Sequence, residues 1–135
     1  EDIVAEKAKI LLVDDDPDFV DATRIVLETE YDVSVALNGD EGLAKARAEK
    51  PDLIILDIIM PDKDGFMVCE ELKSDANLAD VPVMMLTSFA ERKGETSLAV
   101  TQGMMLEAED YVDKPVRPDE LLKRVEALLK RLQES

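Results

Sequence analysis

The sequence predicts an α/β protein with a doubly wound (βα)5 fold: a five-stranded parallel sheet of order 2-1-3-4-5 with helices on both faces. Three observations predict it. The 135 residues suffice for one domain. Apolar runs of strand length alternate with segments of helical period, in repeats of about 25 residues, as in parallel strands joined by crossover helices. Three of the runs are continuously apolar, which indicates strands covered on both faces.

The five predicted strands differ in their expected burial. The continuous apolar runs are residues 10–13, 53–56 and 83–86, so these strands belong in the centre of the sheet. Residues 33–35 alternate as in a strand with one wet face, and 111–112 form a short run, so both should be edges. This burial gives the order 2-1-3-4-5, which reverses direction between the first and third strands. Open α/β sheets bind ligands at such a reversal.

Segments of helical period lie between the strands. The predicted helices span residues 17–30, 40–49, 65–75, a region near 91–106, and 118–133. Pro17 and Pro118 stand where a first helical turn tolerates proline, and Asp16 is the predicted N-cap of the first helix. The last helix carries a clear apolar stripe, which comprises Leu121, Leu122, Val125, Leu128, Leu129 and Leu132.

Composition excludes several classes of protein. The net charge of −16 disfavours nucleic acid and anionic lipid as partners, because binding either depends on cations that neutralise phosphates. Without histidine, serine–histidine chemistry and histidine-ligated zinc are excluded, so any metal should be a hard cation bound by oxygen. The single cysteine, Cys69, excludes an internal disulfide, fits a reducing compartment and should fill space in the core. No apolar run approaches the roughly 18 residues of a membrane span, so we expect a cytoplasmic protein.

Carboxylates gather at the predicted reversal of the sheet. Asp14, Asp15 and Asp16 follow the first strand and Asp57 follows the third, so three or four carboxylates should lie within a few ångströms. Like charges this close raise one another's pKa and favour a divalent cation with oxygen ligands, such as Mg²⁺. Aspartates in such loops also serve as helix caps or solvated turns. Asp57, however, has apolar neighbours on both sides, a setting that a solvated carboxylate would avoid.

Two further polar residues reach the same edge of the sheet. Thr87 ends the fourth strand and Lys114 follows the fifth. A metal ion, a hydroxyl and an ammonium around a carboxylate form a cradle for a phosphoryl group. Each residue also has a structural interpretation, because Thr87 could simply end a strand and Lys114 could pair with the acidic residues as an ion bridge. The delivery of complementary groups by four strands favours the phosphoryl cradle.

Four ordered motifs resemble those of bacterial response-regulator receiver domains, which have the CheY-like, flavodoxin-like fold. The motifs are KILLVDDDP at 9–17, LDIIMPDKDG at 56–65, PVMMLTS at 82–88 and DYVDKP at 110–115. The resemblance covers residues 8–133, which leaves 1–7 as an N-terminal extension and 134–135 as a tail. The chain begins with Glu rather than Met, so we expect it to be cut from a longer protein.

The resemblance implies a phosphorylation-activated signalling switch of a two-component system. Asp57 would accept a phosphoryl group from the phosphohistidine of a sensor histidine kinase or a phosphotransfer protein. Lys114 and Thr87 would hold the phosphoryl oxygens. The chain would catalyse only its own phosphorylation and dephosphorylation, and it would act on a downstream protein effector or an attached output domain.

The resemblance also implies how Mg²⁺ is held. Asp15 and Asp57 would bind the metal, Asp14 would contribute through water, and the backbone carbonyl of Ile59 would complete the protein ligands. The Lys114–Pro115 bond resembles one that is cis in the family.

Residues away from the phosphoryl group would transmit and time the signal. In the family, the threonine moves towards the phosphate and an aromatic residue on the fifth strand turns inward, and Tyr111 matches that aromatic. The output surface would then comprise the fourth helix, the fifth strand and the fifth helix, and it could also join two copies of the chain. Ile59 and Phe89 flank the site, and two bulky apolar side chains should slow hydrolysis of the phosphoaspartate.

The segment between Thr87 and Lys114 departs from the family pattern, because it is several residues longer. Glu107 replaces the glycine that usually ends the fourth helix, so the helix could end at Gly103 instead. The apolar residues 104–106 would then pack under the fifth strand or bind a partner.

Two other functions remain open. Mg²⁺-dependent phosphatases and phosphotransferases with an aspartate nucleophile place two aspartates at the spacing of Asp14 and Asp16. However, Asp18 stands where those enzymes have a threonine. The chain could also be a receiver-like scaffold that is not phosphorylated, although the complete set of Asp57, Thr87 and Lys114 argues against it.

Overall fold

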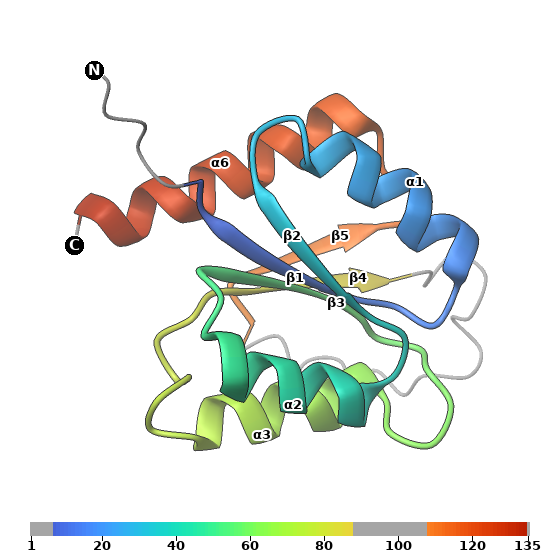
Figure 1. Ribbon diagram of the computed structural model, residues 1–135, viewed down its shortest axis with the longest axis vertical. Coiled ribbons are helices and arrows are strands. Elements are labelled where there is room, and N and C mark those ends of the chain that lie inside the picture. The colour runs from blue at the N-terminus through green and yellow to red at the C-terminus, as the bar shows by residue number, and fades with distance from the viewer. Residues whose placement is uncertain (1–6, 88–107, 135) are drawn as a thin grey trace.

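The computed structural model describes residues 7–87 and 108–134, and these residues include a five-stranded parallel sheet (Figure 1). The strand order is β2-β1-β3-β4-β5, as the sequence predicts. Consecutive strands are parallel throughout, and the direction of winding reverses between β1 and β3. The strands are β1 (Lys9–Val13), β2 (Asp32–Ala36), β3 (Leu53–Asp57), β4 (Val83–Thr87) and β5 (Asp110–Asp113).

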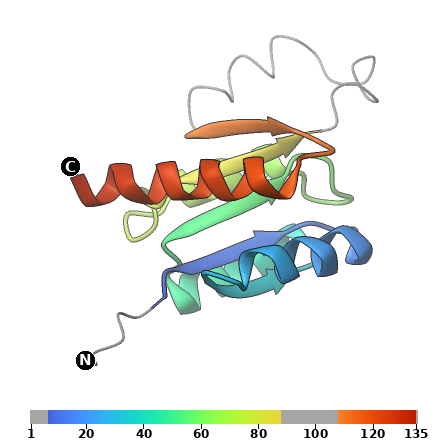
Figure 2. The same ribbon diagram turned by 90° about the horizontal axis from the view of Figure 1, so that it is seen from above.

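Helices cover both faces of this sheet. The two views show α1 and α6 on one face, and α2 and α3 on the other (Figures 1 and 2). The helices are α1 (Pro17–Leu27), α2 (Gly39–Glu49), α3 (Gly65–Ser74) and α6 (Pro118–Glu134). None of the helices in the described ranges is long and apolar enough to span a membrane.

The predicted helix boundaries differ from the observed ones mainly at the end of α1, which stops at Leu27 rather than at residue 30. The amide of Thr29 donates to the carbonyl of Val26 and that of Glu30 to the carbonyl of Leu27, so the chain tightens into a turn. The predicted helix near 91–106, and the departures from the family at Gly103, 104–106 and Glu107, lie outside the described residues.

The core has two layers, because the buried strands alternate their side chains between the two faces. On β1, Leu11 and Val13 pack with residues of α2 and α3, whereas Ile10 and Leu12 pack with residues of α1 and α6. All four side chains are at most 1% exposed. Cys69 lies in the first layer and is fully buried, as expected of a residue that fills space. Continuous apolar runs in the sequence therefore correspond to strands covered on both faces.

The edge strand β2 is less exposed than its alternating sequence predicts. Val33, Ser34 and Val35 are all half-buried, so neither face of the strand is fully wet. The Ser34 hydroxyl donates a hydrogen bond of 2.6 Å to Oε1 of Glu49 at the end of α2. A helix that begins shortly after β2 thus covers the side that was expected to face water.

The first turn of α1 is fixed by the acidic segment that precedes it. Asp16 is the N-cap, as predicted, and its Oδ1 accepts the amide protons of Asp18 and Phe19 at 3.0 and 3.4 Å. A carboxylate at this position also interacts favourably with the positive end of the helix dipole. The cap therefore fixes where α1 begins relative to the end of β1.

The turn between β3 and α3 brings two backbone segments into close contact at Gly65. The Gly65 amide donates to the Ile58 carbonyl at 2.8 Å. A Cβ at position 65 would lie within 3.0 Å of backbone atoms of Asp57 and Ile58, which no side-chain rotation can relieve. Only glycine fits this approach without moving the end of β3.

We expect Gly65→Ala to destabilise the protein by about 1–3 kcal/mol, the usual cost of overpacking. Urea denaturation measures this loss. Gly42→Ala is the comparison variant, since its added methyl group would meet the side-chain methyls of Val13 at 2.9 and 3.0 Å rather than backbone atoms, and alanine is the better helix former. Its loss should therefore be smaller than that of Gly65→Ala. An equal loss in both variants would contradict the special role of position 65.

Candidate functional site

Three carboxylates converge where the winding of the sheet reverses. Asp14 and Asp15 follow β1, and Asp57 ends β3. One oxygen from each carboxylate lies within 4.8 Å of the other two. Asp14 and Asp57 are almost fully buried, at 0% and 4% exposed, whereas Asp15 is exposed. The predicted convergence is therefore confirmed for these three residues, while Asp16 is occupied as a helix cap.

Asp14, Asp15 and Asp57 form the acidic pocket. Both carboxylate oxygens of Asp14 accept hydrogen bonds from groups around this pocket. Its Oδ1 accepts the backbone amide of Asp16 at 2.9 Å, and its Oδ2 accepts the ammonium of Lys114 at 2.7 Å. Burial raises the pKa of Asp14, although the hydrogen bonds from Lys114 and Asp16 partly offset that effect. The buried charge is thus tolerated because it is hydrogen-bonded on both sides.

Asp57 is buried between opposing electrostatic influences from Asp14 and Lys114. Burial, followed by the negative charge of Asp14, raises the pKa of Asp57 to about 6. The Lys114 ammonium, 3.3 Å from its Oδ1, lowers the pKa but does not outweigh those two effects. An acid whose ionised form is disfavoured in this way gains from any additional positive charge nearby.

Lys114, directly after β5, supplies a positive charge. Burial alone lowers the pKa of Lys114, but its hydrogen bond to Asp14 and the charge of Asp57 outweigh burial, so the pKa is raised. The backbone amide of Lys114 donates to the carbonyl of Thr87 at 2.7 Å, and the Lys114–Pro115 bond is cis, as the resemblance implies. The ion bridge that the sequence analysis considered is therefore present, with the ammonium 2.7 Å from Asp14 and 3.3 Å from Asp57.

Thr87 and Tyr111 lie on the same face of the sheet, on adjacent strands. In the register of β4 and β5, Met85 pairs with Tyr111 and Thr87 with Asp113. Side chains alternate along a strand, so Thr87, Met85 and Tyr111 face the α2–α3 layer. Thr87 is 2% exposed and Tyr111 is half-buried. Thr87 at the end of β4 therefore shares one face of the sheet with Tyr111 of β5.

The loop after β3 carries Ile59, two residues after Asp57. Ile59 is half-buried and packs against the α2–α3 layer of the core. The preceding amide, of Ile58, donates to the carbonyl of Leu86 at 2.9 Å, which anchors the start of this loop to β4. Phe89, the second residue expected beside the site, lies outside the described residues.

Phe19 is a contact of the site that the sequence analysis missed. Its ring centroid lies 4.3 Å from Nζ of Lys114. Its position in the sequence could have indicated this contact, because residue 19 lies in the first turn of the helix that follows Asp14, Asp15 and Asp16. A groove of about 530 Å³ runs beside this contact, lined by Phe19, Ala22, Thr23, Val26, Lys114, Pro115, Val116, Pro118 and Leu121.

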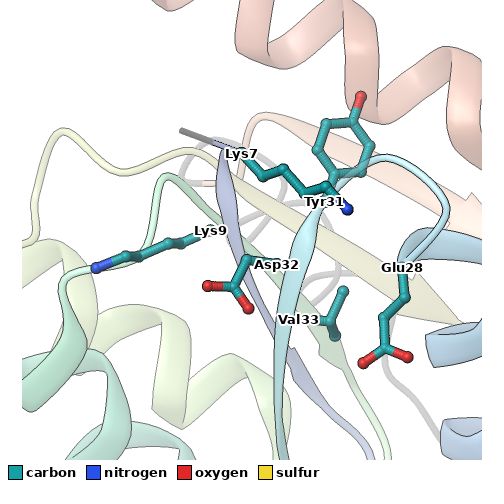
Figure 3. Close-up of a pocket in the computed structure, with 6 residues that line it drawn as sticks. All are labelled: Lys7, Lys9, Glu28, Tyr31, Asp32 and Val33. Carbon is teal, nitrogen blue, oxygen red and sulfur yellow. The ribbon is translucent and has the colours of Figure 1, made fainter. Parts of the chain in front are cut away.

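A second pocket, of about 470 Å³, lies at the opposite end of the strands. It is lined by Lys7, Lys9, Glu28, Tyr31, Asp32 and Val33. Figure 3 shows that the charged ends of Lys9 and Glu28 point in different directions, so these groups do not converge on a common point. Within the described residues, the acidic cluster close enough to hold a metal ion is Asp14, Asp15 and Asp57.

Comparisons with curated proteins identify relatives of this chain. The DNA-binding dual master transcriptional regulator RpaA of Synechocystis sp. is 44% identical over 124 residues, which are 91% of this chain and 49% of RpaA. The alkaline phosphatase synthesis transcriptional regulatory protein PhoP of Bacillus subtilis is 41% identical over 124 residues, with the same shares of the two chains. This chain thus spans about half the length of the curated relatives it matches. RpaA is described as DNA-binding. The relatives therefore do not support the expectation that nucleic acid is not a direct partner.

Solved structures match over nearly the whole chain. A CheY-like response regulator receiver domain protein from Methanospirillum hungatei has a TM-score of 0.83 and 30% identity, covering 96% of this chain and 98% of its own. Chemotaxis protein CheY4 of Vibrio cholerae has a TM-score of 0.78 and 32% identity, covering 90% and 98%.

The family comparison agrees with the fold and with the relatives. The model for the response regulator receiver domain matches residues 10–126, which include the described sheet except for Lys9 at the start of β1. This chain belongs to the family of response regulator receiver domains.

Proposed function

We propose that this chain is the phosphoacceptor of a two-component system, with Asp57 receiving the phosphoryl group in a Mg²⁺-dependent reaction. The donor is the phosphohistidine of a sensor histidine kinase or of a phosphotransfer protein. One observation carries the proposal: Asp57 is 4% exposed, has carboxylate oxygens of Asp14 and Asp15 within 4.8 Å, and lies 3.3 Å from the ammonium of Lys114. An ionised carboxylate beside a cation can serve as the nucleophile in phosphoryl transfer, because the cation offsets negative charge on the phosphoryl group.

The acidic pocket fits a divalent cation. Its three carboxylate oxygens lie within 4.8 Å of one another, and hard cations such as Mg²⁺ prefer oxygen ligands. Asp15, Asp57 and the backbone carbonyl of Ile59 would hold Mg²⁺, and Asp14 would contribute through water. When bound, Mg²⁺ supplies positive charge that offsets the negative charge of the nucleophile and of the incoming phosphoryl group.

Asp57, Lys114 and Thr87 have separate roles in the reaction. An oxygen of Asp57 forms a bond to phosphorus as the phosphorus–nitrogen bond of the donor phosphohistidine breaks, and the electron pair leaves with the imidazole. The Lys114 ammonium, 3.3 Å from Oδ1 of Asp57, binds a phosphoryl oxygen. The Thr87 hydroxyl binds another. The buried strands around Asp57 limit the access of water to the product.

Phosphorylation is then communicated to a partner through β5. The shared face of Thr87 and Tyr111 supports a switch in which Thr87 moves towards the phosphate and Tyr111 follows. The output surface comprises the segment 91–106, β5 and α6, and it controls a downstream effector or an attached output domain. DNA-binding and transcriptional regulatory relatives favour an output in gene expression. The same surface is available for homodimer formation.

The placement of Asp16 weighs against a phosphatase built on Asp14 and Asp16. Oδ1 of Asp16 accepts amide protons from α1, and Asp14 is fully buried against Lys114. A mobile acid/base residue is therefore lacking at that position.

With acetyl phosphate and Mg²⁺, we expect the protein to gain the mass of one phosphoryl group, and Asp57→Asn to remain unmodified. Intact-mass spectrometry and a phosphate-release assay follow the reaction. Asp62→Asn, an exposed aspartate on the same loop, is the matched control and should be modified normally. Many turnovers of phosphate release would favour a phosphatase instead, and absence of modification would favour a scaffold.

We expect the phosphoryl group to be lost slowly, because the apolar side chain of Ile59 hinders an attacking water. Ile59→Asn should therefore shorten the lifetime of the phosphoaspartate several-fold, measured as loss of the added mass after removal of the donor. A longer lifetime in Ile59→Asn than in the wild type would contradict this role.

The charge of Asp57 should destabilise the metal-free protein at neutral pH. Since the pKa is about 6 in the folded state against 3.8 ordinarily, the folded state binds the proton more tightly. This residue's contribution to stability thus increases as the pH falls from about 6 to 4. Asp57→Asn should stabilise the metal-free protein by up to about 3 kcal/mol at pH 7.5 and by less at pH 5.

Urea denaturation of the wild type, Asp57→Asn and the control Asp62→Asn at the two pH values tests this expectation. Mg²⁺ binding to the wild type should weaken below pH 6, where protons compete for Asp57. A stability gain in Asp57→Asn that does not depend on pH would show that the acidic pocket is not strained.

A further inference from the structure

The ring of Phe19 lies against the ammonium that serves Asp57. Nζ of Lys114 is 4.3 Å from the ring centroid, within the range of a cation–π interaction. The same nitrogen lies 2.7 Å from Oδ2 of Asp14 and 3.3 Å from Oδ1 of Asp57. The ammonium is therefore held by two carboxylates and by one group that carries no net charge.

The segment that supplies the carboxylates also places this ring. Oδ1 of Asp14 accepts the amide of Asp16, and the side chain of Asp16 in turn accepts the amides of Asp18 and Phe19. Phe19 thus occupies a defined position in the first turn of α1. This short chain of hydrogen bonds connects the acidic pocket to the aromatic contact.

The contact is partly shielded from water. The side chain of Lys114 is 19% exposed, and Phe19 is half-buried in the wall of the groove between α1 and the segment that leads into α6. A cation–π interaction is stronger where the cation has lost part of its hydration. The ring therefore faces a partly desolvated ammonium.

Binding of a divalent cation changes the balance of these contacts. The following step rests on the proposed function. With a divalent cation bound, Asp57 would share its oxygens with the metal, and the metal would repel the ammonium, since both are positive. The ring of Phe19 is not a ligand for a hard cation, so its attraction for the ammonium persists. We propose that Phe19 is a positioning residue, which keeps Lys114 beside Asp57 when the carboxylates turn to the metal.

Phe19→Leu tests the proposal because it keeps an apolar side chain but removes the aromatic face. We expect the rate of modification by acetyl phosphate to fall by about threefold to tenfold, the range of a partly desolvated cation–π interaction. Phe19→Tyr, which keeps an aromatic face, should retain most of the rate. Acetyl phosphate is used because it needs no protein partner, so effects on docking do not enter.

Val26→Ala is the matched control, since Val26 lines the same groove on α1. It should react at the wild-type rate. If Phe19→Leu folds poorly, Phe19→Met offers the same comparison with a flexible apolar side chain.

An NMR measurement on unphosphorylated protein gives a second readout. The ring current of Phe19 should move the Hε resonances of Lys114 upfield of those of exposed lysines, with and without Mg²⁺. Loss of these resonances in Lys114→Met assigns them. They should move downfield in Phe19→Leu and stay upfield in Val26→Ala.

The proposal is overturned if the Lys114 resonances match those of exposed lysines once Mg²⁺ is bound. It is also overturned if Phe19→Leu reacts at the wild-type rate, or if Val26→Ala slows the reaction equally. Failure of the wild type to react at all would reject the proposed function, whereas the resonances during a Mg²⁺ titration would still decide the role of Phe19.

Discussion

The constraint behind this structure is the placement of three carboxylates, two of them paired with a single ammonium, at one edge of a buried sheet. Two of the carboxylates, Asp14 and Asp57, are almost fully buried, and burial is the main cause of the raised pKa of each. Lys114 pairs with both but balances only one negative charge. The excess negative charge makes the pocket unfavourable by itself and receptive to a divalent cation.

The rest of the fold offsets the cost of that pocket. The two core layers bury β1 except at Lys9, and they bury β3 along its whole length. Burial of this much apolar surface stabilises the folded state and offsets the destabilisation caused by the strained site. Contacts such as Gly65 against the end of β3 and the Asp16 cap of α1 then hold the surrounding loops. Core and site are therefore parts of one arrangement, because the apolar strands are what remove Asp14 and Asp57 from water.

The strand order was predicted correctly because a strand that is buried on both faces has a continuous run of apolar residues. Continuous apolar runs identified the inner strands, and the weaker runs identified the edges, which was enough for the strand order. The prediction for β2 was less accurate. The alternating pattern indicated that one face of β2 is in water, but Ser34 is half-buried and hydrogen-bonded to Glu49 of α2. The end of α1 was also misplaced, because a tight turn after Leu27 has no strong sequence signal. Local patterns do not report contacts made between elements.

The sequence by itself determined the sheet order and brought Asp14, Asp15 and Asp57 to a common edge, because parallel strands present their carboxyl ends together. Only the tertiary structure decided how these groups share the space. It buried Asp14 more deeply than Asp15, raised the pKa of Asp57, and set the ring of Phe19 against Lys114. These properties depend on desolvation and on distances of a few ångströms between elements remote in the sequence, and residue order alone carries no measure of either.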